Sequence, residues 1–406
     1  MDERLRDLED TSPDIAAEIR KRGGLYDECA IEDVLDRHLF LNAIMHFGHM
    51  VRLTTERYYA GTGRRLQFGI VNSLKIMAFA SSSKNDVDFI GVSVGALSFV
   101  SAVSTRMLSN PNVLTHIGSA GLEKHNCQAL PMPGEQDPES FSPIRPNCPV
   151  RGAFAKHWAL TGLDFIFAHE ITHLTSGHLA LQKKAKHADP AKARPKLSLL
   201  EVQAIELDAD RGATEWMLEF TEFVRNSEEE LCLDSNHALR QSWDAFYKEE
   251  SATMMYCFMA SYLALRMHRP RCWDPTHQFL TSQPEPPLRM GTLMGYYADA
   301  LKQIYSISWE KAQEQVSAWC LVSEQAFADL VADSGRGEVD DGVISSFFER
   351  VGDYYEKVST AYELLAPELN ELAMPEARAR PEVEDLGCGT TSGTRPLPGV
   401  GDMGLA

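Results

Sequence analysis

The segment from Phe167 to Leu179 reads FAHEITHLTSGHL and contains three histidines and one glutamate. His169 and His173 are four residues apart, so on a helix they stand about 40° from each other and can reach one metal ion. Glu170, next to the first histidine, would project beside that ion, where a carboxylate can accept a proton from a water molecule. The spacing H-E-x-x-H therefore predicts a zinc-binding helix with Glu170 as the general base.

The surroundings of this motif bear on whether it is catalytic or structural. In a chain with 13 histidines, H-E-x-x-H arises by chance in roughly a few per cent of cases, and paired histidines can also be satisfied inside a helical bundle. A helical run of apolar side chains around the motif would, however, bury the site: Leu163, Ile166, Phe167, Ile171 and Leu174. Burial on a helix is the setting that the motif requires, so we favour the catalytic interpretation.

His178 is the third histidine of the segment, and a three-histidine site would need it as a ligand. The metzincin pattern places its last histidine six residues after the second one, whereas His178 follows His173 by five. If the helix continued, His178 would lie about 140° around from His173. We therefore assign His178 to the structure and expect the third ligand further along the chain.

A second helical pattern, from Leu199 to Val224, contains a candidate for that ligand. It includes ELDAD, in which Glu206 follows His173 by 33 residues and Asp210 lies one helical turn after Glu206. Glu206 would complete a His, His, Glu ligand set, and Asp210 would accept a hydrogen bond from the far nitrogen of a ligand histidine. Two acids at this spacing are also common on solvated helix faces, but their pairing with H-E-x-x-H favours a site.

Taken together, HEITH and ELDADR resemble the gluzincin metallopeptidases. In that family a zinc ion is held by H-E-x-x-H on one helix and by the glutamate of E-x-x-x-D on the next. The form with alanine before the aspartate, here Glu206, Ala209 and Asp210, is similar to the CAAX prenyl endopeptidase and HtpX group. More loosely, the chain resembles the phage-exclusion protease Lit, a bacterial cytosolic enzyme. The resemblance covers residues 163–213 and implies a zincin-like core.

The resemblance also implies a substrate-binding strand and an oxyanion-binding pair. Gluzincins bind substrate as an extra strand on the exposed edge of their sheet, and FIGVSV, beginning at Phe89, is the best candidate for that edge. An ordinary buried strand is equally compatible with these residues. The endopeptidase group further places a histidine and an arginine near the oxyanion, and His277 and Arg289 are similar in kind but more widely spaced. A loop histidine and a salt-bridged arginine are the alternative.

The rest of the chain predicts the elements that would position this site. Three short apolar runs, beginning at Gln67, Lys75 and Phe89, predict the strands of a small sheet. Helices and one long loop or insertion are expected elsewhere: helices at 31–59, 96–108, 158–182, 199–224 and throughout 236–372, and the loop at 109–150. We therefore predict an α+β fold that is mostly helical, with a zincin-like core, a small sheet and a large C-terminal helical part.

We expect the 406 residues to be organised in four parts. N-terminal helices at 1–66 precede a metallopeptidase core at 67–235, and a helical region at 236–373 completes the domain. A tail at 374–406 has too few large apolar groups to offset the entropy of ordering, so it should be disordered. Residues 183–196, KKAKHADPAKARPK, carry six lysines or arginines and one acid. This basic loop could recruit an acidic substrate or partner, although such runs are usually solvated loops.

Composition narrows the class of protein. The 39 basic and 58 acidic side chains give a formal net charge of -19, which disfavours a nucleic-acid binder. Eight cysteines without a CxxC pair indicate neither a disulfide framework nor a thiolate zinc site. The charged N-terminus has no apolar signal core, and the most apolar run, Ile90 to Val103, is too short to span a bilayer. We expect a soluble cytoplasmic protein with no membrane partner.

These expectations combine into a zinc endopeptidase that acts on a protein or peptide. A dedicated or latent protease of regulation or phage defence is one form that it could take. In this hypothesis His169, His173 and Glu206 hold Zn²⁺, Glu170 is the base and Asp210 orients a ligand. The alternative is a non-catalytic zinc scaffold that binds a protein partner through its helical half. Glu170 argues against the scaffold, because a structural site has no use for a base. The sequence indicates no oligomeric state.

Overall fold

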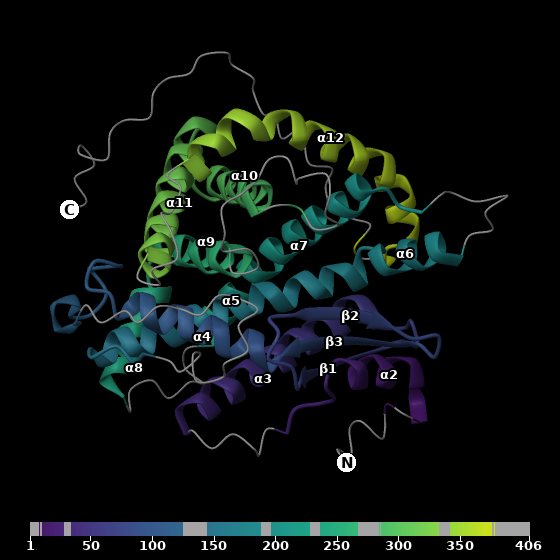
Figure 1. The fold of residues 1–406 in the computed structure, drawn as a ribbon, viewed down its shortest axis with the longest axis horizontal. Helices are drawn as coiled ribbons and strands as arrows, with labels where there is room; N and C mark the ends of the chain where they lie inside the picture. The colour runs from purple at the N-terminus through teal and green to yellow at the C-terminus, as the bar shows by residue number, and fades with distance from the viewer. Residues whose placement is uncertain are drawn as a thin grey trace.

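The fold combines a three-stranded sheet with a large set of helices, in agreement with the predicted mostly helical α+β class (Figure 1). The computed structural model describes residues 8, 10–27, 34–124, 144–187, 196–227, 236–266, 284, 286–332, 342–375 and 377. The helices and strands within these residues are α2 (Pro13–Lys21), α3 (Val34–Thr54), η2 (Thr55–Tyr59), β1 (Arg65–Val71), β2 (Ala78–Ser82), β3 (Val87–Ser93), α4 (Val94–Leu108), η3 (Ala120–Leu122), α5 (Pro149–Thr175), α6 (His178–His187), α7 (Leu199–Asn226), α8 (His237–Tyr247), α9 (Glu250–Arg266), α10 (Pro286–Tyr305), α11 (Trp309–Ala332) and α12 (Gly342–Leu372).

The sheet has the strand order β1-β3-β2, so β3 is its central strand. β3 pairs in parallel with β1 and antiparallel with β2. The prediction that FIGVSV forms the exposed edge is therefore wrong, and the alternative of a buried strand is correct. All seven residues of β3 are buried, which explains its nearly continuous apolar sequence. β2, with the short and partly polar sequence AFASS, is the edge strand that contacts α5.

Alternating side chains cover the two faces of the sheet. On one face Phe79 and Phe89 pack against Ile15 and Ile19 of α2. A Cβ atom at Gly91 would lie only 2.3 Å from the ring of Phe79, so the glycine allows this ring to cross the sheet. The opposite face joins the main core with α3 and α5.

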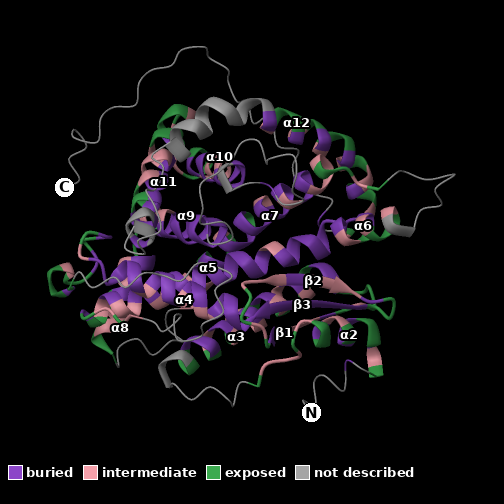
Figure 2. Cartoon of the chain, in the orientation of Figure 1, coloured by how far each residue is buried: buried purple, intermediate pink, exposed green. Residues whose placement is uncertain are grey.

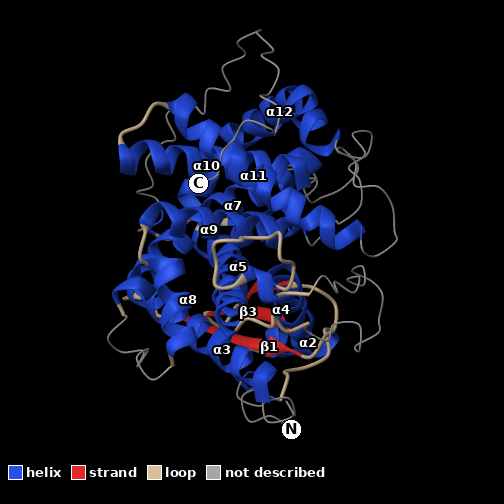
Figure 3. Cartoon of the chain, turned by 90° about the vertical axis from the view of Figure 1, so that its left-hand side faces the viewer, coloured by secondary structure: helices blue, strands red, loops and turns tan. Residues whose placement is uncertain are grey.

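α5 is the central helix of the fold and is buried along most of its length (Figure 2). It lies between the sheet and the helices of the C-terminal half, an order of layers that is also visible in Figure 3. The predicted helix at 158–182 has different bounds in the structure, because α5 begins at Pro149 and ends at Thr175. Gly177, with φ +81°, separates α5 from α6. This left-handed conformation suits glycine and ends the helix.

The C-terminal end of α12 packs against this break. A Cβ atom at Gly177 would lie 2.9 Å from the backbone nitrogen of Ala373 and 2.9 Å from the carbonyl oxygen of Leu369. The backbone N–H of Met374 donates a hydrogen bond to the carbonyl of Thr175 at 2.9 Å. The predicted disorder of 374–406 is therefore wrong for its first residues, because they are tied to the end of α5. Residues 376 and 378–406 lie outside the described residues.

The other predicted elements can be placed as follows. Residues 31–59 contain α3 and η2, residues 96–108 belong to α4, and the C-terminal half forms α8 to α12. α7 begins at a capping box, in which Ser198 and Glu201 exchange side-chain and backbone hydrogen bonds.

Residues 183–187 belong to α6 rather than to the predicted basic loop, and residues 188–195 lie outside the described part. No helix in the described part is long and apolar enough to cross a membrane.

Candidate metal centre

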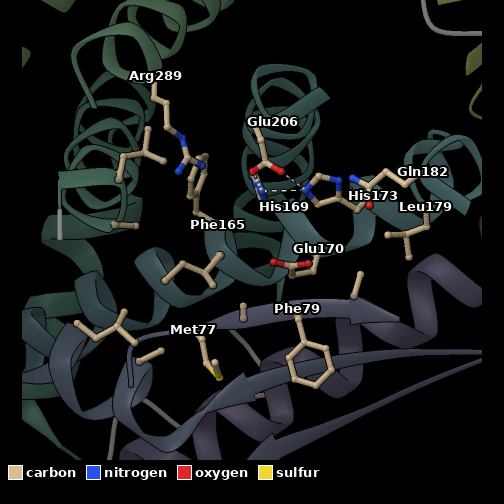
Figure 4. A pocket seen from close by; sticks show the side chains of 17 residues that line it. Met77, Phe79, Phe165, His169, Glu170, His173, Leu179, Gln182, Glu206 and Arg289 are labelled. Carbon is tan, nitrogen blue, oxygen red and sulfur yellow. Dashed lines mark hydrogen bonds and ion pairs between the residues drawn. The ribbon is translucent and has the colours of Figure 1, made fainter. Parts of the chain in front are cut away.

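The three predicted ligands meet at one point between α5 and α7. The Nε2 atoms of His169 and His173 are 3.1 Å apart. The carboxylate oxygens of Glu206 lie 3.5 Å from Nε2 of His169 and 3.7 Å from Nε2 of His173. Figure 4 shows the two imidazoles and the carboxylate facing one another. These side chains form a group that could hold a metal ion.

The spacing of these atoms fits a tetrahedral ion. Zinc binds imidazole nitrogen and carboxylate oxygen at roughly 2.1 Å, so neighbouring ligand atoms of a tetrahedral site lie about 3.4 Å apart. The closest approaches of the three side chains, 3.1, 3.5 and 3.7 Å, are near that value, and the two carboxylate contacts are made by different oxygens of Glu206. One ligand atom from each residue lies within 4.8 Å of the other two. Two imidazole nitrogens this close also require a proton or a cation between them, because their lone pairs repel each other.

The three candidate ligands are mostly buried but keep some exposure to a cleft. The side chains of His169, His173 and Glu206 retain 12%, 8% and 17% of their exposure. These small fractions belong to atoms that face a cleft of ≈ 390 Å³. A metal ion held here would therefore keep one side open to a water molecule or a substrate, as catalytic zinc sites do.

Asp210 holds His169 from behind, as the sequence predicted for a ligand histidine. Its Oδ1 atom lies 2.9 Å from Nδ1 of His169, and the carboxylate is fully buried. Arg289 in α10 donates two further hydrogen bonds to Asp210, from Nε to Oδ2 at 2.7 Å and from a terminal nitrogen to Oδ1 at 2.6 Å. Burial alone would raise the pKa of Asp210, but Arg289 and His169 hold it below its usual value.

Arg289 and His277 are the two residues that the resemblance placed near the oxyanion. Arg289 lines the cleft, but its guanidinium forms the buried salt bridge with Asp210. Of the two interpretations of Arg289, the salt bridge is the one that the structure shows. His277 lies outside the described residues.

Glu170 lies between the three ligands and β2 (Figure 4). Burial raises the pKa of its carboxyl to about 7, although His169 and a hydrogen bond from the backbone N–H of Ala80 oppose this shift. A carboxyl with this pKa exchanges protons readily near neutral pH, which is what general acid–base catalysis requires.

The pKa values of the three candidate ligands are shifted in different directions. Burial opposes the charged form of His169, but hydrogen bonds to Asp210 and Glu206 raise its pKa to about 10. Burial lowers the pKa of His173 to about 3, so this second imidazole stays neutral. The pKa of Glu206 is lowered by both histidines despite its burial. Without a metal, His169 is therefore the imidazole that holds the additional proton, and its positive charge lies where a cation would bind.

The wall of the cleft opposite the ligands is the edge strand β2 and the residues just before it. Ala80 donates its N–H to Glu170, and the carbonyl of Ser82 accepts a hydrogen bond from Lys183. Outward-facing backbone groups alternate along an antiparallel strand, so the N–H and C=O groups of Ala78, Ala80 and Ser82 all face away from β3. Apolar side chains line much of the remaining wall, among them Met77 and Phe165.

His178 and Asp208 lie behind His173, and the sequence pattern gave them no role at the site. Nδ1 of His178 is 3.0 Å from Nδ1 of His173, and Nε2 of His178 is 2.9 Å from Oδ2 of Asp208. The expectation that His178 lies 140° around from His173 assumed a continuous helix, and the break at Gly177 removes that assumption. A glycine after serine, as in Ser176–Gly177, is the local signal that could have predicted this break.

No protein-family model, curated protein or solved structure matches this chain. Any assignment of function therefore depends on the residues and geometry of this site.

Proposed function

We propose that this protein is a zinc-dependent endopeptidase with a zincin-like core, in which His169, His173 and Glu206 hold the ion. The observation that carries the proposal is the group of two imidazoles and one carboxylate, whose nearest nitrogen and oxygen atoms are 3.1 to 3.7 Å apart, beside the buried carboxyl of Glu170. Two imidazoles and one carboxylate are a typical donor set of catalytic zinc. The resemblance of HEITH and ELDAD to the gluzincins supports the same assignment.

The edge strand supports a peptide as the substrate. β2 presents the outward backbone groups of Ala78 and Ala80 to the cleft that contains the ligands, and Ser82 follows on the same edge. An extended peptide can pair with such an edge by main-chain hydrogen bonds, which would hold its backbone next to Glu170. Alternate side chains of that peptide would then point into the apolar part of the cleft near Met77 and Phe165.

Glu170 supports hydrolysis as the reaction. A zinc ion at this site would polarise the scissile carbonyl and lower the pKa of a bound water to about 7. Glu170 would accept a proton from the attacking water and donate it to the leaving amine. The Glu170 carboxyl faces the backbone of Ala80, so the base lies beside the strand that would bind the substrate. In this proposal Arg289 keeps Asp210 charged and His169 oriented.

The substitution Glu170→Gln tests the assigned base, because it removes the carboxylate but keeps the size of the side chain. Peptide hydrolysis should fall by at least about 10²-fold while the zinc content stays at one ion per chain. Glu219→Gln is the matched control, because Glu219 lies on the exposed side of α7 and pairs with Arg57. Unchanged hydrolysis in Glu170→Gln would contradict the assigned base.

We further propose that the endopeptidase cleaves few proteins. The chain's own side chains already occupy two outward groups of β2, because Lys183 binds the carbonyl of Ser82 and Glu170 binds the N–H of Ala80. A substrate strand has to displace the Lys183 contact, which disfavours weakly bound peptides. Digestion of a peptide library should yield few products, and cleavage of many unrelated peptides would contradict this selectivity. No cleavage of any peptide or protein would favour the non-catalytic scaffold.

A further inference from the structure

A second layer of polar side chains lies behind His173, on the side away from its Nε2 atom. His178 contacts Nδ1 of His173 at 3.0 Å and Asp208 at 2.9 Å. His178 is completely buried and Asp208 is 6% exposed, so solvent does not replace these contacts. We propose that His178 and Asp208 form a positioning pair that holds His173 in the tautomer and orientation required for metal binding. This inference rests on the proposed metal centre.

The positions of the protons follow from the geometry. Nε2 of His173 faces His169 and Glu206, so a metal ion would bind this nitrogen and the neutral ring would carry its proton on Nδ1. That proton points to Nδ1 of His178, which must then be free of a proton. The proton of a neutral His178 is consequently on Nε2, which donates to Asp208. In this arrangement each donor meets one acceptor.

The two ligand histidines are thus held by different parts of the chain. His169 contacts the carboxylate of Asp210 directly, and that carboxylate is bound by α10 through Arg289. His173 reaches its carboxylate, Asp208, through the ring of His178. A direct contact would require an acid within reach of Nδ1 of His173, and His178 occupies that position.

The positioning pair is anchored to α12. Asp208 accepts a hydrogen bond from Arg211, and the same nitrogen of Arg211 lies 3.2 Å from the hydroxyl of Tyr362 in α12. α12 also packs against Gly177, directly before His178, so the same helix fixes both ends of the pair. The long C-terminal helix is therefore part of the support of the metal site.

Zinc affinity tests the positioning pair without reference to hydrolysis. The full-length protein is stripped of metal, and its affinity for Zn²⁺ is measured by competition with a chromophoric chelator. His178→Leu keeps most of the volume but removes both hydrogen bonds, and should weaken Zn²⁺ binding about 10- to 100-fold. His178→Asn places a carbonyl oxygen where Nδ1 was, and should retain affinity within about threefold of the unmodified protein.

His46→Leu is the matched control. His46 also pairs with a buried aspartate, with its Nδ1 3.0 Å from Oδ2 of Asp164, but it does not contact His173. This variant should lose stability and keep its affinity for Zn²⁺ within about threefold. If His178→Leu likewise binds Zn²⁺ within threefold of the unmodified protein, the positioning pair is wrong.

A second measurement needs no variant, and so remains informative if His178→Leu does not fold. In zinc-loaded protein labelled with ¹⁵N-histidine, NMR should assign the proton of His178 to Nε2 and that of His173 to Nδ1. A proton on Nδ1 of His178 would overturn the inference. The outcomes also separate the two proposals: an unmodified protein that binds no Zn²⁺ contradicts the metal centre and with it the pair. Tight, His178-dependent Zn²⁺ binding without peptide hydrolysis contradicts only the endopeptidase.

Discussion

Arg289 binds both carboxylate oxygens of Asp210, at 2.7 and 2.6 Å, and the same carboxylate lies 2.9 Å from Nδ1 of His169. Arg289 and Asp210 are 79 residues apart in the sequence and belong to α10 and α7. The C-terminal half of the chain therefore contributes directly to the candidate metal centre. Because both groups are buried, the guanidinium keeps Asp210 charged and able to orient His169.

Replacing Arg289→Met should both destabilise the protein and weaken its zinc site. Removal of the guanidinium leaves the buried Asp210 charge with less compensation, so the free energy of unfolding should fall by about 3 kcal/mol. Zinc affinity should fall at least about tenfold, because His169 loses its fixed partner. The control is Arg266→Met, which breaks the buried contact of Arg266 with Glu324 at 3.2 Å. Equal zinc affinities in the two variants would show that Arg289 has no role at the site.

Gly177→Ala should be strongly destabilising. Its φ of +81° is unfavourable for alanine, and the new Cβ would lie 2.9 Å from backbone atoms of Leu369 and Ala373. We expect a loss of about 2 kcal/mol or more in urea unfolding, together with weaker zinc binding, because His178 follows directly. Gly152→Ala is the control on α5, since a Cβ there meets no atom within 4 Å. It should be neutral or stabilise the helix by up to about 1 kcal/mol. Similar stabilities for the two variants would contradict the close approach of α12.

His157 predicts a dependence of stability on pH that is independent of the metal centre. This residue of α5 packs among the aromatic rings of Trp243, Phe246 and Tyr247, and its Nε2 has no hydrogen-bond partner among the described residues. Burial, reinforced by the nearby charge of His46, lowers the pKa of His157 to about 4. An unfolded histidine has a pKa of about 6.5, so between these values the unfolded chain binds more protons.

The stability that this neutral ring contributes is therefore present above about pH 6.5 and is lost as the pH falls towards 4. His157→Phe keeps an aromatic ring but cannot titrate. Between pH 7 and pH 5 the free energy of unfolding should decrease in the unmodified protein by about 1 to 2 kcal/mol more than in His157→Phe. Urea unfolding at the two pH values measures this difference. The same fall in both proteins would exclude His157 as the titrating group.

The candidate ligand set could be predicted from the sequence because local rules determine most of it. The helical period alone places His169 and His173 on one face, and a second helical pattern supplies Glu206 and Asp210. Contact between the two helices then brings the three ligands together. The mostly helical architecture follows from the same periodicity.

The other features depend on contacts between distant segments. The resemblance to the gluzincins favoured FIGVSV, which precedes the active helix, as the edge strand. Strand order is set by pairing, however, and the edge strand that contacts α5 has the sequence AFASS. His178 reaches His173 across the break at Gly177, against which α12 packs from almost two hundred residues further along the chain. No local pattern indicates that Arg289 would find Asp210, or that Asp208 would find His178.

The central claim is that His169, His173 and Glu206 hold zinc, and the zinc content of the purified protein tests it most directly. Elemental analysis after equilibration with Zn²⁺ and removal of the excess should find one ion per chain in the unmodified protein and in His46→Ala. His169→Ala should retain almost none under the same conditions, because the remaining imidazole and carboxylate cannot hold the ion alone. Zinc retained unchanged in His169→Ala would contradict the proposed site.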